Sequence, residues 1–174
     1  AASLRSRDFP PLSCLLVEYD QGGRLPVTPG LPDESFQRGG VPMTKEEVRA
    51  VSLAKLRLTE EAVVYDVGAG TGSVSVEAAL QAWRGTVYAI ERNPEACDLI
   101  AENCRRFAAR NVTIISGSAP EALQELPAPT HVFLGGTGGS MAGILRCVLE
   151  KNLRVRVVID AVTLETVTQI LTLT

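Results

Sequence analysis

The sequence predicts an α/β fold in which helices cover both faces of an open parallel sheet. Short, nearly all-apolar runs alternate with longer stretches of helical periodicity along the 174 residues, and buried parallel strands joined by crossover helices produce this pattern. The alternation occurs five times. A glycine-rich turn follows the first apolar run, at the end of a strand where open parallel sheets bind ligands. We therefore expect one domain with its functional site at the carboxyl ends of the strands.

The first helix and the first strand follow a loop rich in glycine and proline. Thr44 is placed as the N-cap of the helix, and Glu47, three residues later, completes a potential capping box. The helical pattern continues to Leu56. The apolar run 62–67 (AVVYDV) is the predicted first strand, and residues 72–83 form the predicted helix after it.

Four further pairs of strand and helix are expected. Asn93 is the predicted N-cap of the next helix and Pro94 its first residue, where a missing amide hydrogen costs nothing. The remaining strands are expected at 86–91, 112–116, 131–136 and 154–161, and the helical patterns at 93–111, 120–126, 140–152 and 164–174.

Composition and charge disfavour several classes of protein. The formal charge of −3 argues against a nucleic-acid partner, because affinity for a phosphate backbone comes mainly from clustered Lys and Arg. No apolar run approaches the roughly 18 residues of a membrane span, and the first residues lack the apolar block of a secretion signal. With four Cys, no C-x-x-C pair and one His, no metal site is expected. A cytoplasmic protein is expected.

The turn after the first strand has the sequence YDVGAGTGSV over residues 65–74. Glycine tolerates positive φ and lets the backbone approach a ligand, while the following helix presents its positive end. The spacing is G-x-G-x-G. A dinucleotide fingerprint would need a sixth-position glycine where Ser73 stands, and no Gly-Lys-Ser/Thr follows to make a P-loop. The candidate ligand-binding residues of this loop are Gly68, Ala69, Gly70, Thr71 and Gly72.

Two acidic residues narrow the type of ligand. Glu91 ends the second strand, where a carboxylate can accept hydrogen bonds from both hydroxyls of a ribose. Asp66 precedes the glycine turn and is placed either to orient it or to meet an amino group of the ligand. Together with the glycine spacing, these acids indicate an adenosyl ligand that has no pyrophosphate.

At this point the sequence resembles the class I S-adenosylmethionine-dependent methyltransferases, with DVGAGTG as the first motif and AIERNPE as the second. A more specific resemblance rests on GLPDESFQRGGVPMTKEEVRAVSLAKLRL, DVGAGTGSVSVEAA, VYAIERNPEA, GSAPEAL and VFLGGTGG, in this order over about residues 30–160. These motifs are similar to those of the decarboxylating precorrin methyltransferases of cobalamin biosynthesis. The resemblance implies a Rossmann-like domain that methylates carbon 15 of precorrin-6B or cobalt-precorrin-6B and decarboxylates the acetate on carbon 12.

The resemblance also implies roles for individual residues. Thr44 contacts the S-adenosylmethionine cofactor, the glycine turn holds its methionine part, and Glu91 binds its ribose. Ala119 lies beside the adenine through its backbone, and Ser118 stands where an Asp is commoner in the family. The loop LGGTGGS (134–140), with Gly135 and Gly136, faces the tetrapyrrole substrate.

No nucleophilic side chain is needed, because methyl transfer from a sulfonium is an in-line displacement that depends on alignment. A catalytic residue is therefore not assigned. We hypothesise that basic side chains pair with the carboxylates of the substrate, and that Arg does so bidentately. The candidates are Arg38, Lys45, Arg49 and Arg92. His131 begins the fourth strand, at the opposite end of the sheet from the site, and is expected to be structural.

The domain organisation is also an expectation from the resemblance. Residues 1–30 resemble the tail of an upstream tetrapyrrole methylase domain and its linker, and residues 31–174 are the methyltransferase domain. A complete sheet of this class has two more strands, commonly a hairpin, and the sequence ends before them. The family implies a homo-oligomer, a tetramer.

Two alternatives remain open from the sequence. The chain could be a class I methyltransferase that acts on RNA or on another small molecule. Against an enzyme that methylates amino groups of bases, GGTGG stands after the fourth strand in place of Asn/Asp-Pro-Pro-Tyr/Phe. The chain could also be a catalytically silent module that binds an adenosyl ligand.

Overall fold

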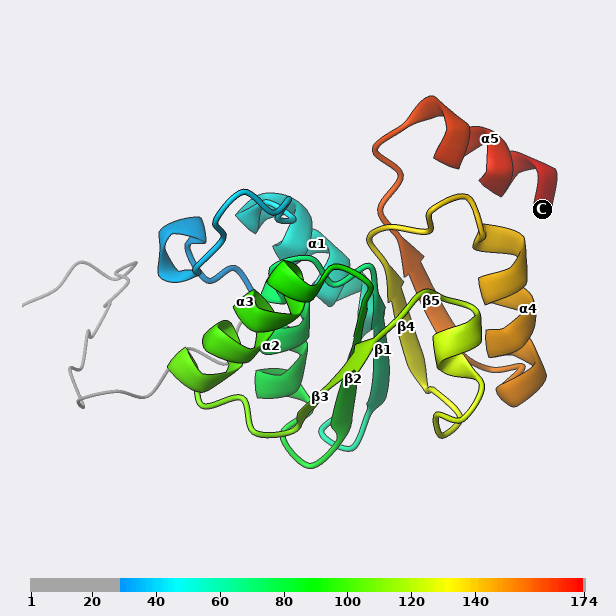
Figure 1. Cartoon of the computed structure of the whole chain (residues 1–174). Helices are drawn as coiled ribbons and strands as arrows, with labels where there is room; N and C mark the ends of the chain where they lie inside the picture. Colours follow the sequence, from blue (N-terminus) through cyan, green and yellow to red (C-terminus); the bar gives the residue numbers. More distant parts are fainter. Residues whose placement is uncertain (1–28, 174) are drawn as a thin grey trace, which may run out of the picture.

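The computed structural model describes residues 29–173, and these form one sheet with helices on both of its faces (Figure 1). The strands are β1 (Val63–Val67), β2 (Thr86–Glu91), β3 (Val112–Ser116), β4 (His131–Leu134) and β5 (Arg156–Ile159). The α-helices are α1 (Glu46–Leu56), α2 (Ser73–Gln81), α3 (Pro94–Arg106), α4 (Met141–Lys151) and α5 (Leu164–Leu173). Two one-turn 3₁₀ helices, η2 (Asp33–Ser35) and η3 (Glu121–Leu123), complete the described elements.

β1 lies at the centre of the sheet, which has the order β3-β2-β1-β4-β5 and only parallel neighbours. The chain moves outward from β1 to β3 and then crosses to β4 on the other side of β1. The carboxyl ends stay level, because Val67 is opposite both Ile90 and Leu134. An open parallel sheet leaves a crevice at such a reversal. The predicted α/β class is confirmed.

Alternating residues of β1 divide the core into two layers. Val64 packs with residues of α1 and α2 in one apolar cluster, whereas Tyr65 and Val67 pack with Ile144 and Val148 of α4 in another. Figure 1 shows the same division, with α1, α2 and α3 on one side of the sheet and α4 and η3 on the other. Both faces of the central strand are buried, as its nearly all-apolar sequence predicts.

Most of the predicted elements are confirmed, and β2 and β3 have the expected bounds. Asn93 caps α3 by accepting a hydrogen bond from the amide of Glu95 (3.0 Å), with Pro94 as the first helical residue. β4 is shorter than expected, because the amides of Gly135 and Gly136 both turn to the carbonyl of Val67 (3.0 and 3.2 Å). The helical pattern at 120–126 yields only the single turn of η3.

The capping box predicted for α1 is wrong. α1 begins at Glu46, its N-cap position is Lys45, and no side chain caps its first turn. Thr44 lies one residue too early for the role. Its carbonyl instead accepts a hydrogen bond from Nη1 of Arg49 (2.6 Å), so a side chain of the helix itself fixes the backbone just before it.

The upstream tail and linker expected over residues 1–30 fall almost entirely outside the described residues. Between residues 29 and 173, no helix combines the length and the apolar character that a bilayer span requires. The same residues contain no group of three or more His, Cys, Asp or Glu side chains arranged to hold a metal ion.

Candidate functional site

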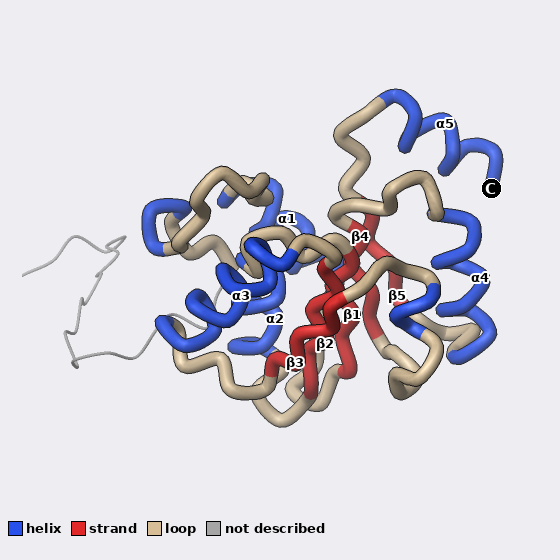
Figure 2. Tube along the Cα trace, in the orientation of Figure 1, coloured by secondary structure: helices blue, strands red, loops and turns tan. Residues whose placement is uncertain are grey.

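A cavity of about 660 Å³ lies at the carboxyl ends of the strands, where the loops gather in Figure 2. Five stretches of chain supply most of its wall, and six single residues complete it: Ala96, Glu121, Ser140, Ile144, Asp160 and Val162. The five stretches are Val41–Thr44, Val67–Gly70, Ile90–Asn93, Gly117–Ala119 and Gly135–Gly138. The fold therefore brings the glycine turn, the end of β2 and the loop after β4 around one space, as the sequence predicts.

Positive φ angles and close contacts with neighbouring loops explain why the turn contains glycines. Gly68, Gly70 and Gly72 have φ of +74°, +56° and +76°, in the left-handed region that favours glycine. A Cβ on Gly68 would stand 2.7–2.9 Å from backbone atoms of Gly136, and one on Gly70 would stand 2.8 Å from the carbonyl oxygen of Pro42. The absence of side chains thus lets three loops of the cavity wall approach one another.

The first three amides of the turn are already used within the protein. Those of Gly68 and Ala69 donate to the carbonyl of Ile90 (3.0 and 3.1 Å), and that of Gly70 donates to Glu91 Oε2 (2.9 Å). These three amides are therefore engaged before any ligand binds.

Glu91 joins two of the loops that line the cavity. Besides accepting from Gly70, its carboxylate accepts from the amides of Arg92 and Asn93 through Oε1 (2.9 Å each). Each carboxylate oxygen has two lone pairs, so Oε2 keeps one for a ligand hydroxyl. The position at the cavity wall agrees with the ribose role expected from the sequence, and that role stays a prediction.

Asp66, Thr71 and Gly72 do not line the cavity. Asp66 is buried and accepts a hydrogen bond from Ser75 Oγ (2.5 Å), which ties β1 to α2. Desolvation in this position raises the pKa of Asp66 to about 6. The carbonyl of Thr71 accepts from Asn103 Nδ2 (2.8 Å). The sequence suggests two roles for Asp66. Its bond to Ser75 fits the role of orienting the turn, whereas a contact with a ligand amino group does not fit, because Asp66 does not line the cavity.

Among the described residues that line the cavity, Arg92 carries the one positive charge, against Glu91, Glu121 and Asp160. Its Nη1 lies 3.8 Å from the position of a Cβ on Gly138, so it faces the loop after β4.

The other three basic candidates lie outside the cavity lining. Arg38 is exposed. Lys45 pairs with Asp33 (3.2 Å). The hypothesis that Arg49 binds substrate carboxylates does not fit the structure, because its side chain is fully buried and bonded to Glu77, Asp33 and two backbone carbonyls. The spacing of Arg49, Ser52, Leu53 and Leu56, which share the buried face of α1, is the sequence signal that could have shown this.

Residues 34–174 match the model of a family described as the precorrin methyltransferase domain. The chain belongs to this family.

Named relatives of the precorrin methyltransferase domain agree with the match. A protein of Pyrobaculum calidifontis named "probable cobalt-precorrin-6B C(15)-methyltransferase (decarboxylating)" is 49% identical over 142 residues, which are 80% of this chain and 73% of the relative. The cobalt-precorrin-6B C(15)-methyltransferase (decarboxylating) of Salmonella typhimurium is 50% identical over 116 residues, 66% of this chain and 59% of the relative. The crystal structure of precorrin-6Y C5,15-methyltransferase from Geobacter metallireducens has a TM-score of 0.78 and 41% identity, covering 85% of this chain and 78% of that one.

Sequence reasoning missed several residues that line the cavity of this precorrin methyltransferase domain. Asp160 directly follows β5, so the rule that sites gather at the carboxyl ends of strands could have identified it. Glu121 follows the short loop after β3 in the same way. Val41, Pro42 and Met43 carry no such signal, because only the tertiary path of the chain before α1 brings them to the glycine turn.

Proposed function

We propose that this chain transfers a methyl group from S-adenosylmethionine to carbon 15 of precorrin-6B or cobalt-precorrin-6B and removes the carboxyl group of the carbon 12 acetate as carbon dioxide. The observation that carries the proposal is the single cavity that joins the adenosyl-type motifs, the glycine turn and Glu91, to the double glycine Gly135–Gly136 after β4. The relatives named above act, by their names, at carbon 15 with decarboxylation.

The residues of the cavity fit the cofactor group by group. Glu91 would accept hydrogen bonds from the ribose, and the carbonyls of Gly68 and Gly70 would accept from the ammonium of the methionine part. Ser118 and Ala119 would border the adenine, and Thr44 would close the site from the segment before α1. The bound cofactor supplies an activated methyl group on a sulfonium, which is a good leaving group. Asp66, Thr71 and Gly72 would act through the shape of the turn.

The loop after β4 would receive the substrate. Gly135, Gly136 and Gly138 carry no side chains above β4, which allows a flat macrocycle to lie against the backbone. Arg92 would form a bidentate pair with a substrate carboxylate at the same loop. The chain needs to hold the accepting carbon in line with the methyl group, because such alignment alone supplies several kcal/mol to a displacement. The electron pair left by loss of carbon dioxide enters the conjugated ring of the substrate.

A turnover experiment tests the proposal. The protein is incubated with S-adenosylmethionine and either precorrin-6B or its cobalt form, and the molecular mass of the product is measured by mass spectrometry. We expect one added methyl group and one lost carbon dioxide per macrocycle. Binding of labelled cofactor without any transfer would make the chain a silent adenosyl-binding module. Transfer of label to RNA and none to the tetrapyrrole would assign the alternative substrate class.

A further inference from the structure

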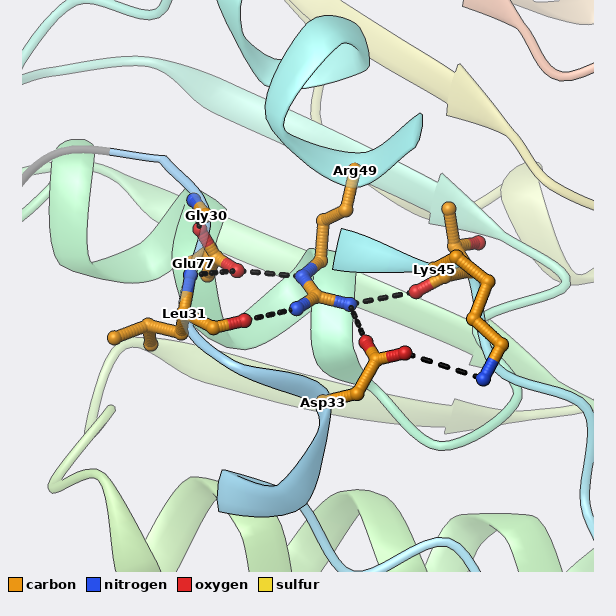
Figure 3. Close-up of polar contacts among 7 residues, drawn as sticks. Gly30, Leu31, Asp33, Lys45, Arg49 and Glu77 are labelled. Atoms are coloured by element: carbon orange, nitrogen blue, oxygen red, sulfur yellow. Dashed lines mark hydrogen bonds and ion pairs between the residues drawn. The ribbon is translucent and has the colours of Figure 1, made fainter. Parts of the chain in front are cut away.

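Arg49 of α1 and Glu77 of α2 form an ion pair inside the protein. Their side chains are 0% and 2% exposed, and Nε of Arg49 lies 2.5 Å from Oε1 of Glu77. Figure 3 shows the two side chains meeting between the helices and the segment that precedes α1. The guanidinium also lies over the ring of Phe36, at 4.8 Å from the ring centroid.

Every other hydrogen bond that the side chains of this pair make holds the segment before α1. We call residues 30–44 the strap. Arg49 Nη2 donates to the carbonyl of Leu31, and Nη1 donates to the carbonyl of Thr44 (2.6 Å) and to Asp33 (3.2 Å). Glu77 accepts from the amides of Gly30 (2.7 Å) and Leu31 (3.1 Å). The ion pair thus fixes both ends of the strap, as the dashed lines in Figure 3 show.

The strap forms part of the cavity. Val41, Pro42, Met43 and Thr44 line it, and the carbonyl of Pro42 stands against Gly70 of the glycine turn. Between its two fixed ends the strap is also held by Asn103 of α3, whose side chain bonds the amide and the carbonyl of Gln37 (2.8 Å each). Phe36 adds an apolar anchor, because it is buried against Phe107 with the ring centroids 4.7 Å apart. Apart from η2, the strap has no regular secondary structure, so these side chains determine where its backbone lies.

Stability alone is a weak reason for a buried ion pair. Desolvation of two charges costs about as much as their attraction returns, and an apolar pair of similar volume often stabilises a protein more. An apolar pair could not bind the carbonyls of the strap. The planar fork of Arg49 directs its donors at fixed angles to Glu77, to Leu31 and to Thr44, and Lys has no such fork.

We propose that the Arg49–Glu77 pair positions the strap against the glycine turn and thereby sets the affinity of the cavity for its adenosyl ligand. The inference rests on the proposed function for the identity of that ligand. It makes Arg49 and Glu77 positioning residues, which touch neither cofactor nor substrate and act through Val41–Thr44.

Two variants of the full chain test this role. Glu77→Gln keeps the shape of the side chain and removes its charge, and Arg49→Lys keeps the charge and removes the fork. Calorimetry with S-adenosylhomocysteine measures the affinity, and urea unfolding measures the stability. We expect each variant to raise the Kd by about tenfold, a common size of coupling between sites. At saturating S-adenosylmethionine, kcat should stay near that of the natural chain while the KM for this cofactor rises.

Asn111→Ala is the matched control. The side chain of Asn111 also holds backbone, because it donates to the carbonyls of Ala79 and Ala82 at the end of α2 (3.1 and 2.8 Å). These contacts lie at the opposite end of the sheet from the cavity. Their loss should lower stability and leave the Kd within about twofold, since distant sites usually act independently. Cleavage by trypsin after Arg38, an exposed residue of the strap, gives a second readout. This cleavage should be faster in Glu77→Gln and Arg49→Lys, and unchanged in Asn111→Ala.

The outcomes separate the two proposals. If the natural chain does not bind S-adenosylhomocysteine, the proposed function fails. If the natural chain binds it and the variants bind equally well, or lose affinity only as the control does, the positioning role fails. If both variants are too unstable to fold, Asp33→Asn is used instead, because it removes the partly exposed partner of Arg49 Nη1. An unchanged Kd and an unchanged rate of trypsin cleavage in Asp33→Asn would overturn the positioning role.

Discussion

At the residue scale, the carboxylate of Glu91 joins two of the loops that line the cavity. Its two oxygens hold three backbone amides from the glycine turn and from the start of α3. Such charge-assisted bonds are roughly twice as strong as neutral ones. The same residue borders the cavity. The acid at the end of β2 therefore shapes the two loops between which the ribose is proposed to lie.

Asp66 is expected to make stability depend on pH. Burial raises its pKa to about 6 from an ordinary value of 3.8. Between these values the folded protein holds a proton that the unfolded chain has released, so stability falls as pH rises from about 4 through about 6 and is level above that. A shift of this size corresponds to a loss on the order of 2–3 kcal/mol. The reason is that burial of the ionised carboxylate of Asp66 costs free energy, whereas burial of its protonated form does not.

Asp66→Asn removes this titration and keeps an acceptor for Ser75. We expect the free energy of unfolding, measured in urea from pH 4 to pH 8, to decrease less for the variant than for the natural chain. The variant should therefore gain relative stability above pH 6. Asp98→Asn, on the exposed face of α3, is the control and should follow the natural curve. Parallel curves for the natural chain and Asp66→Asn would show that Asp66 is not the group responsible.

At the scale of the element, the glycine turn depends on two different properties of glycine. Gly68 needs a positive φ (+74°) and also a close approach to the backbone of Gly136, whereas Gly139 has a similar φ (+88°) and no atom within 4 Å of a potential Cβ. Alanine at Gly139 should therefore lose only the conformational term, about 1 kcal/mol. Alanine at Gly68 must also push the turn away from the loop after β4.

We expect Gly68→Ala to lose at least about 2 kcal/mol of stability, and most of its affinity for S-adenosylhomocysteine. Gly139→Ala should bind normally, because Gly139 does not line the cavity. Urea unfolding and calorimetry on the two variants measure both effects. Equal losses of stability in the two variants would mean that the contact between Gly68 and Gly136 does not constrain the loops.

The elements that could be predicted from the sequence are those whose causes are local. The strands at 86–91 and 112–116 and the Asn93–Pro94 start of α3 depend on apolar runs and capping chemistry within a few residues. The hypothesis for Arg49 failed because its partners Leu31 and Glu77 lie far along the chain. A buried Arg in a helix looks like an exposed one until the whole helix face is considered.

For the molecule as a whole, the order of the strands is what assembles the site. The cavity residues range from Val41 to Val162 along the chain, and the reversal between β1 and β4 places the loops after β2, β3 and β4 around the glycine turn. The motifs could be recognised in the sequence because each follows a strand. The strap before α1 could be recognised only through the family resemblance, since its place at the cavity depends on buried polar contacts with α1, α2 and α3.

Binding in that cavity should stabilise the entire domain, because the unfolded chain has no assembled site. S-adenosylhomocysteine at about 100 times its Kd adds roughly 2.7 kcal/mol, which for a domain of this size raises the Tm by roughly 5–10 °C. NAD and ATP should not raise the Tm comparably. The G-x-G-x-G turn, with no Gly-Lys-Ser/Thr after it, lacks the spacing of a loop that binds a pyrophosphate. Thermal unfolding followed by circular dichroism with each compound measures the difference. All loops assigned to the adenosyl site belong to the domain whose unfolding is followed, so a ligand that binds there must raise the Tm. A higher Tm with NAD or ATP and an unchanged Tm with S-adenosylhomocysteine would therefore contradict the adenosyl site.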